Sequence, residues 1–152
     1  MTFPMLADFA VRLGCGLAAL LSLTSWRAVP LAFFRTHCLI ILGLLVLAVL
    51  DAYRVGVRGP LLVALIVSGV LSYLAGVAWG LGVPRVARPT TWLITSVTVG
   101  IVCAVDPGLT TRISAGWAGA GRLASAFLMG STLTAMLLGH HYLTAPAMSI
   151  EP

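Results

Sequence analysis

Apolar residues fill most of this chain in stretches that only short arginine- and proline-containing breaks interrupt. The stretches approach ~20 residues, the length that an α-helix needs to cross the hydrocarbon core of a membrane. The pattern therefore predicts an all-α integral membrane protein. We expect a bundle of five transmembrane helices, forming one domain over residues 1–152 with no soluble domain. The expected spans are residues 6–26, 31–53, 60–83, 90–105 and 116–143.

Proline and glycine mark the expected ends of these helices. Gly59-Pro60 turns the chain into the third span, because proline suits the first turn of a helix. We interpret residues 84–89, which begin and end with proline, as a break. The fourth span is then only ~16 residues long, barely enough to cross a membrane. The glycine-rich residues 115–121 are expected to form an interfacial or half-inserted stretch that precedes Arg122.

The first span is expected to be a retained helix rather than a cleaved signal peptide. Asp8 and Arg12 lie one turn apart within its first two turns. A signal peptide would instead place a basic residue before the apolar run and end in a small-residue cleavage site.

Composition supports a membrane location. Hydrophobic residues make up 60% of the chain and charged residues 9%, and the mean hydropathy is +1.08. A soluble domain carries roughly a quarter charged residues, so this chain could not cover its surface with polar groups. The net charge of +5 comes from nine basic residues, all of them arginine. The absence of lysine is typical of a high-GC genome and favours a bacterial inner membrane.

The arginines lie at or near the predicted helix ends, where guanidinium groups meet lipid phosphates. No basic stripe and no aqueous domain exist to carry nucleic-acid binding, which we therefore exclude. The arginines are divided almost evenly between the two expected membrane faces and do not decide the orientation.

The sequence contains none of the residue patterns that carry common enzyme chemistry. The four acidic residues, Asp8, Asp51, Asp106 and Glu151, form no pair suited to acid–base catalysis. The three cysteines form no CxxC motif, which indicates small buried apolar residues rather than a zinc site. We therefore expect a non-catalytic protein.

Two histidines are the candidate ligands for a cofactor. His37 lies in the second span and His140 near the end of the fifth, so that counting spans places both near one membrane face. Two imidazoles at similar depth suit the two axial positions of a haem iron. Arg35 could then pair with the haem propionates. This hypothesis needs the second and fifth helices to be neighbours; the alternative is that both histidines are ordinary interfacial residues.

Arg122 is a further candidate for cofactor binding. Arginines within a membrane are costly and usually pair with a carboxylate, a lipid head group or a quinone oxygen. The alternative is that the side chain extends to the interface, where its charge remains hydrated.

Small residues one turn apart predict where helix backbones approach closely. The third span has one such pair, and the last helix has the longest set, which makes it the expected central or docking helix. We expect these residues to face protein rather than lipid: Gly76, Gly80, Gly121, Ser125, Ala126 and Gly130.

Small size and the absence of catalytic patterns favour a subunit of a larger bacterial membrane complex. The class that we expect is an electron-transfer complex, respiratory or photosynthetic, in which the chain scaffolds other membrane subunits and binds haem, quinone or lipid. The alternative is a small homo-oligomeric transporter or channel. Against that alternative, the centres of the predicted helices lack the acids, Asn and Gln that line ion and substrate paths.

Overall fold

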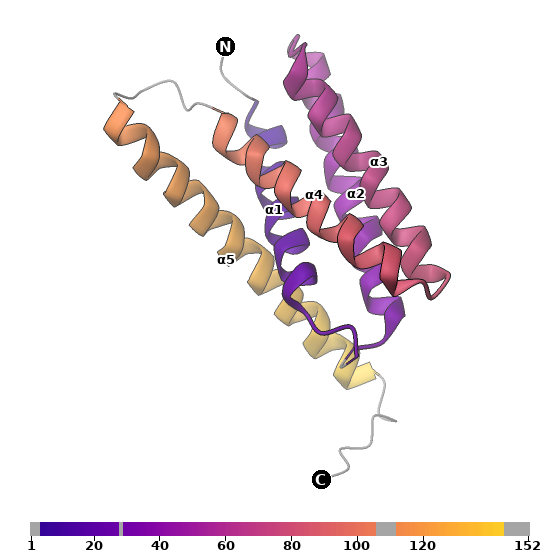
Figure 1. The fold of residues 1–152 in the computed structure, drawn as a ribbon. Coiled ribbons are helices and arrows are strands. Elements are labelled where there is room, and N and C mark those ends of the chain that lie inside the picture. Colours follow the sequence, from indigo (N-terminus) through magenta and orange to yellow (C-terminus); the bar gives the residue numbers. More distant parts are fainter. Residues whose placement is uncertain (1–3, 28, 106–111, 145–152) are drawn as a thin grey trace.

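The computed structural model describes residues 4–27, 29–105 and 112–144, with only the backbone described at 112–115 and 141–144. This part of the chain is helical, and it contains no strand. The five helices are α1 (Met5–Leu23), α2 (Leu31–Arg54), α3 (Pro60–Gly80), α4 (Pro84–Ala104) and α5 (Arg112–Thr144). Each is long and apolar enough to cross a membrane. The expected all-helical fold with five candidate spans is confirmed (Figure 1).

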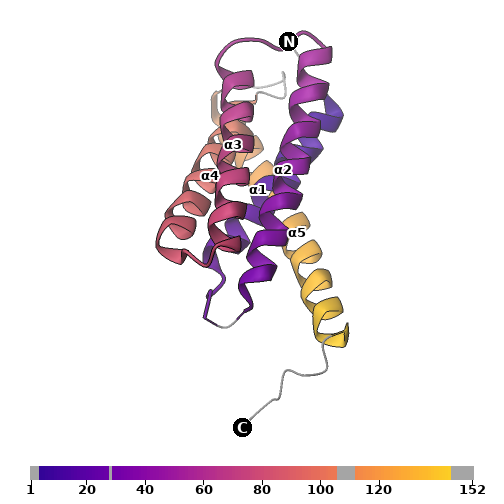
Figure 2. The same ribbon diagram turned by 90° about the vertical axis from the view of Figure 1, so that its right-hand side faces the viewer.

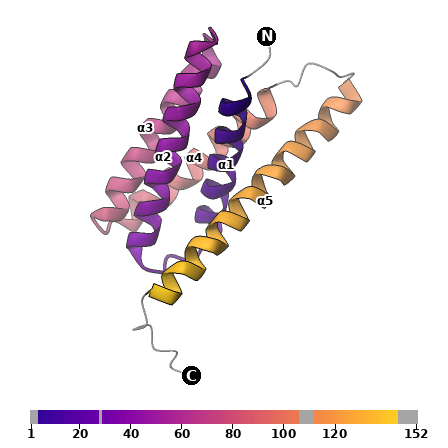
Figure 3. The same cartoon turned by 180° about the vertical axis from the view of Figure 1, so that it is seen from behind.

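The helix α1 lies at the centre of the bundle. Among the described residues it contacts α2, α4 and α5, whereas α3 contacts only α2 and α4. We call the end where α1 begins the N-terminal end; α2 and α4 also finish there (Figures 1 and 2). The opposite, C-terminal end holds the last turns of α1, the α3–α4 turn and the end of α5. Consequently α1 and α5 run in the same direction, and α5 crosses α1 at an angle (Figure 3).

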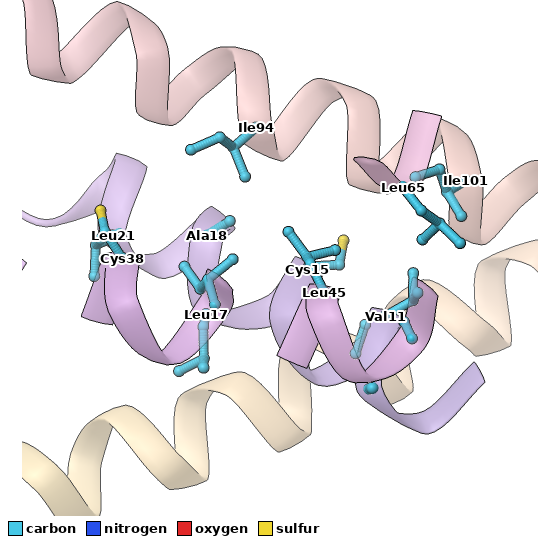
Figure 4. Packing of buried hydrophobic residues seen from close by; sticks show 14 of the residues in the cluster. Val11, Cys15, Leu17, Ala18, Leu21, Cys38, Leu45, Leu65, Ile94 and Ile101 are labelled. Carbon is cyan, nitrogen blue, oxygen red and sulfur yellow. The ribbon is translucent and has the colours of Figure 1, made fainter. Parts of the chain in front are cut away.

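Small side chains explain the central place of α1. Three neighbours can approach one helix only where its side chains are short, because bulky residues would hold the backbones apart. Larger side chains from α2, α3 and α4, such as Leu45, Leu65 and Ile94, fill the space around α1 (Figure 4). The small buried residues of α1 are Ala7, Ala10, Gly14, Cys15, Gly16, Ala18 and Ala19.

The closest approach in the bundle joins α1 to α5 at Gly16 and Gly130. A Cβ atom built at Gly130 would lie 2.7 Å from Gly16 Cα, and one built at Gly16 would overlap the carbonyl oxygen of Ala126. Only glycine therefore fits at these two positions. The expectation that Ala126 and Gly130 face protein is confirmed, since both are buried.

The other small residues have mixed outcomes. Gly76 is buried, and a Cβ atom built there would lie 3.5 Å from Cys38 Cβ. Gly80 is exposed but lies against the Arg35 side chain. Ser125 is partly buried. The expectation for Gly121 is wrong: it is exposed, and a Cβ there would meet nothing within 4 Å. The reason is that α5 diverges from α1 on the N-terminal side of their crossing (Figures 1 and 3).

Two expected helix boundaries are also wrong. The helix α4 begins at Pro84 rather than at residue 90, and it is 21 residues long, so the fourth span is not short. Proline is well placed at the first helical position. Pro89 lies inside the helix, although a proline there has no N–H to donate and its ring crowds the preceding turn. The helix α5 is likewise continuous from Arg112, through the glycine-rich residues 115–121.

Buried hydroxyl groups line the inner face of α4. The hydroxyls of Thr91, Thr95 and Thr98 each donate to a carbonyl of their own helix, at 2.8 to 3.1 Å. Two further bonds cross between helices, and in the first of them Ser22 Oγ of α1 lies 2.9 Å from Thr95 Oγ1. Trp79 Nε1 of α3 donates to Thr91 Oγ1 at 3.3 Å. Each of these threonine hydroxyls therefore has a hydrogen-bond partner inside the protein, which allows it to be buried in the helix packing.

The Gly16 crossing yields a stability prediction. We expect Gly16→Ala to lower the free energy of unfolding by about 1–3 kcal/mol, because the new methyl group meets backbone atoms that cannot rotate away. The matched control is Gly43→Ala in α2, where a Cβ meets nothing within 4 Å. Thermal unfolding of both variants in one detergent tests this. Equal melting temperatures for the two would contradict the close approach.

Candidate functional site

Arg122 is held by a carboxylate on another helix. Its guanidinium group forms an ion pair with Asp8 on the first turn of α1 and also donates to the carbonyl oxygen of Val105, just after α4. Arg12, one turn further along α1, forms a second ion pair with the same carboxylate. The side chains of Arg122, Asp8 and Arg12 are 13%, 17% and 29% exposed. One aspartate thus links α1 to α5 at the N-terminal end.

A second aspartate completes this arrangement. Asp51, in the last turn of α2, accepts a hydrogen bond from the backbone N–H of Ala7 at 3.0 Å. The first turn of α1 is therefore fastened to α2, because this N–H has no partner within its own helix. Two aspartates and two arginines give the site no net formal charge. We call Asp8, Arg12, Asp51 and Arg122 the ion network.

The chemistry of the ion network is structural. The Asp8 carboxylate accepts from both Arg12 and Arg122, which leaves it poorly suited to take a proton from a substrate. The Nε atoms of the two arginines are buried without a partner. Each guanidinium group therefore has an N–H without an acceptor, and could donate a hydrogen bond to a further oxygen atom. Of the partners expected for Arg122, the structure shows the carboxylate, which Asp8 supplies.

His37 has the geometry of a ligand with one nitrogen committed. It is 2% exposed in α2, and its Nδ1 lies 2.8 Å from the carbonyl oxygen of Phe33. A carbonyl oxygen can only accept, so Nδ1 carries the proton and Nε2 presents a lone pair. Nε2 is buried without a partner. Metal-ligating imidazoles are commonly oriented in this way, by a carbonyl at the other ring nitrogen.

His37 also belongs to an aromatic group on α2 that contacts α3 through Phe34. Its ring centre lies 3.9 Å from that of Phe33, and Phe34 stacks on Trp79 at 4.5 Å. These rings fill the interior toward the C-terminal end, so the imidazole faces packed side chains rather than open lipid. The purely structural alternative, a core histidine held by one carbonyl, fits this packing equally well.

The structure does not bring His37 and His140 onto neighbouring helices. Both lie toward the C-terminal end of the bundle, as expected from counting spans (Figure 1). However, α5 contacts α1 and α4 among the described residues, not α2, so the expected adjacency of the second and fifth helices is wrong. His140 is exposed on α5. Arg35 extends along α3, where its Cδ would lie 3.3 Å from a Cβ built at Gly80.

A multi-ligand metal centre is likewise not formed by the residues described. No three His, Cys, Asp or Glu side chains in that part of the chain lie close enough together to hold a metal ion. Cys15 and Cys38 are both buried and unpaired.

Sequence reasoning missed the two aspartates that organise this site. The available signal was Asp8 itself. Arg12, one turn further along the same apolar helix, is one cation for this carboxylate, which can hold a second. Its second partner, Arg122, is 114 residues away along the chain, and no local pattern predicts such a contact.

No protein-family model, curated protein or solved structure matches this chain. What the chain does is therefore inferred from its own residues.

The ion network yields a second prediction. Asp8→Asn should lower the free energy of unfolding by about 3 kcal/mol, because it leaves two partly buried guanidinium groups without a counter-charge. Adding Arg122→Met to that variant should recover part of the loss, since one uncompensated charge then disappears. Arg54→Met, at an exposed cation of α2, is the control and should be neutral. Purely additive effects of the two substitutions would show that the pair does not interact.

Proposed function

We propose that this chain is inserted in a bacterial inner membrane as a small, non-catalytic subunit of a larger complex. In this proposal α5 is the docking helix for a helix of a neighbouring subunit. The observation that carries the proposal is the open glycine face of α5 between residues 116 and 121. Gly116, Gly119 and Gly121 have open space where a side chain would be, and Trp117 is 79% exposed.

Glycine in this part of α5 is unfavourable for an isolated helix. Each glycine in a helix interior costs about 1 kcal/mol relative to alanine. Within a membrane, small residues recover that cost only where another helix approaches, because lipid chains gain little from a bare backbone. The same helix shows the covered case at Gly130, which is in close contact with Gly16. A neighbouring subunit that covers Gly116 to Gly121 would account for the second glycine group.

The dimensions of α5 support an external partner. Its 33 residues correspond to about 50 Å at 1.5 Å per residue, well beyond the ~30 Å hydrocarbon core. In the most apolar 18-residue stretch of α5, only 17% is buried within the fold, against 61% in the corresponding stretch of α1. The helix is therefore attached at the Gly16 crossing and through Arg122, and much of its remaining surface is available for contact.

Among membrane complexes, we favour one that transfers electrons, respiratory or photosynthetic. His37 supports this choice, because its protonated Nδ1 and unpaired Nε2 suit a cofactor or quinone contact. Haem held between His37 and His140 within one chain gains no support from the helix contacts, since α5 does not contact α2 among the described residues.

The alternative, a homo-oligomeric transporter or channel, has less support. A path through the bundle would need polar groups free to bind an ion or substrate. The buried hydroxyls of α4 instead donate to carbonyl groups of their own helix. In the described residues, Asp8 is likewise bonded to Arg12 and Arg122, and Asp51 to the backbone N–H of Ala7.

The docking proposal is tested by filling the open glycine face. Gly121→Leu should lower the recovery of co-purifying membrane proteins by about tenfold, equivalent to about 1.4 kcal/mol of lost association energy. Gly100→Leu in α4 is the matched control, since its surroundings are equally open. The measurement is quantitative mass spectrometry after mild solubilisation from native membranes. Equal recovery from the two variants would overturn the proposed docking face.

The class of complex is tested on the same preparation. A visible spectrum with a Soret band and co-purifying cytochromes would support electron transfer. Partners without redox cofactors would retain the docking proposal and remove the electron-transfer assignment.

A further inference from the structure

A cleft at the C-terminal end of the bundle gathers three arginines around one space. It measures about 520 Å³ and lies between the segment that follows α1 and the first two turns of α4. Arg27 comes from the first element, and Arg85 and Arg88 come from the second. The remaining walls are the rings of two tryptophans, Trp26 and Trp92, and of two prolines. We call it the arginine cleft.

The positive charge in the arginine cleft is not neutralised by the protein residues described. Arg85 and Arg88 make no hydrogen bond or ion pair there, and Arg27 only lies over the Trp26 ring, 5.3 Å from its centre. The described aspartates, Asp8 and Asp51, are both at the opposite end of the bundle. Three arginine residues along one cleft make this surface positive, so the site favours an anion.

The backbone adds to this attraction. The helix α4 begins at Pro84, on the wall of the cleft, and the start of a helix carries a partial positive charge. Its first N–H groups contribute less, because Pro84 has none and those of Val86 and Ala87 donate to the carbonyl oxygen of Val83. Guanidinium groups bind phosphate through two parallel hydrogen bonds. The charge and the donors together indicate phosphate rather than a simple halide.

The tryptophans determine which source of phosphate fits. Trp92 is 45% exposed, and its ring and that of Trp26 give the cleft broad apolar walls. A free phosphate ion would gain nothing from them. A phospholipid places its phosphate at the level where tryptophan side chains gather in membrane proteins, with its acyl chains beside the apolar rings. Basic clefts between membrane helices bind anionic phospholipids in this way.

We propose that the arginine cleft binds the head group of an anionic phospholipid, with preference for one that carries two phosphates. Three cations without a carboxylate match two phosphates better than one. Arg27 comes from the segment after α1 while Arg85 and Arg88 come from α4, so a bound head group would bridge the two segments. This site does not depend on the subunit role proposed above, because it involves neither α5 nor a protein partner.

The test is lipid binding by the detergent-solubilised full chain, measured by native mass spectrometry. The probes are diphosphatidylglycerol with two phosphates, phosphatidylglycerol with one, zwitterionic phosphatidylcholine, and inorganic phosphate. We expect affinity to fall in that order. Removing one arginine should weaken diphosphatidylglycerol binding about fivefold, and Arg27→Gln/Arg85→Gln/Arg88→Gln together by about a hundredfold.

The matched control is Arg54→Gln/Arg58→Gln, which removes exposed cations from the N-terminal end and should leave binding within about twofold of the parent. Thermal unfolding confirms that each variant is folded, and Arg85→Gln alone replaces the triple variant if that variant is not. Unchanged binding by the cleft variants, or equal loss in the control, would overturn the site. Inorganic phosphate that binds as tightly as the lipid would show a free-anion site and overturn the lipid assignment.

Discussion

The arrangement of this bundle depends on one constraint, the small side chains of α1. A helix that offers alanine, glycine and cysteine to its neighbours can have three other helices close around it, and α1 contacts α2, α4 and α5. Its burial follows from this position: 61% of the most apolar 18-residue stretch of α1 is buried, against 28% of that of α3. Were α1 as bulky as α2, the helices would stand too far apart for the Gly16–Gly130 contact to form.

The two attachments between α1 and α5 share one register. Asp8 and Gly16 are eight residues apart, and so are Arg122 and Gly130. Eight residues correspond to about 12 Å along a helix, so two helices running in the same direction can make both contacts at once. The glycine contact determines the distance between the helices. The ion pair then selects the register, because sliding α5 by one turn would take the Arg122 guanidinium group away from the Asp8 carboxylate.

The elements that could be predicted from sequence are those that depend on neighbouring residues. Apolar runs identified all five helices, since crossing a membrane requires only length and hydrophobicity. Pro84 misled the prediction because proline both begins helices and breaks them, and local sequence does not separate the two cases. Gly121 and Gly130 look alike in sequence, yet only Gly130 meets another backbone. Which glycine is covered depends on where α5 crosses α1.

The ion network likewise could not be predicted from neighbouring residues, and it makes the two ends of the bundle differ in charge. A charged residue in an apolar helix signals that a partner exists, but the partner of Arg122 was identified only by the fold. Once Asp8 holds Arg12 and Arg122, those two cations are withdrawn from the surface of the N-terminal end. The arginines at the C-terminal end have no such carboxylate among the described residues. Arg122 at one end therefore fastens helices together, while Arg27, Arg85 and Arg88 at the other remain available to a ligand.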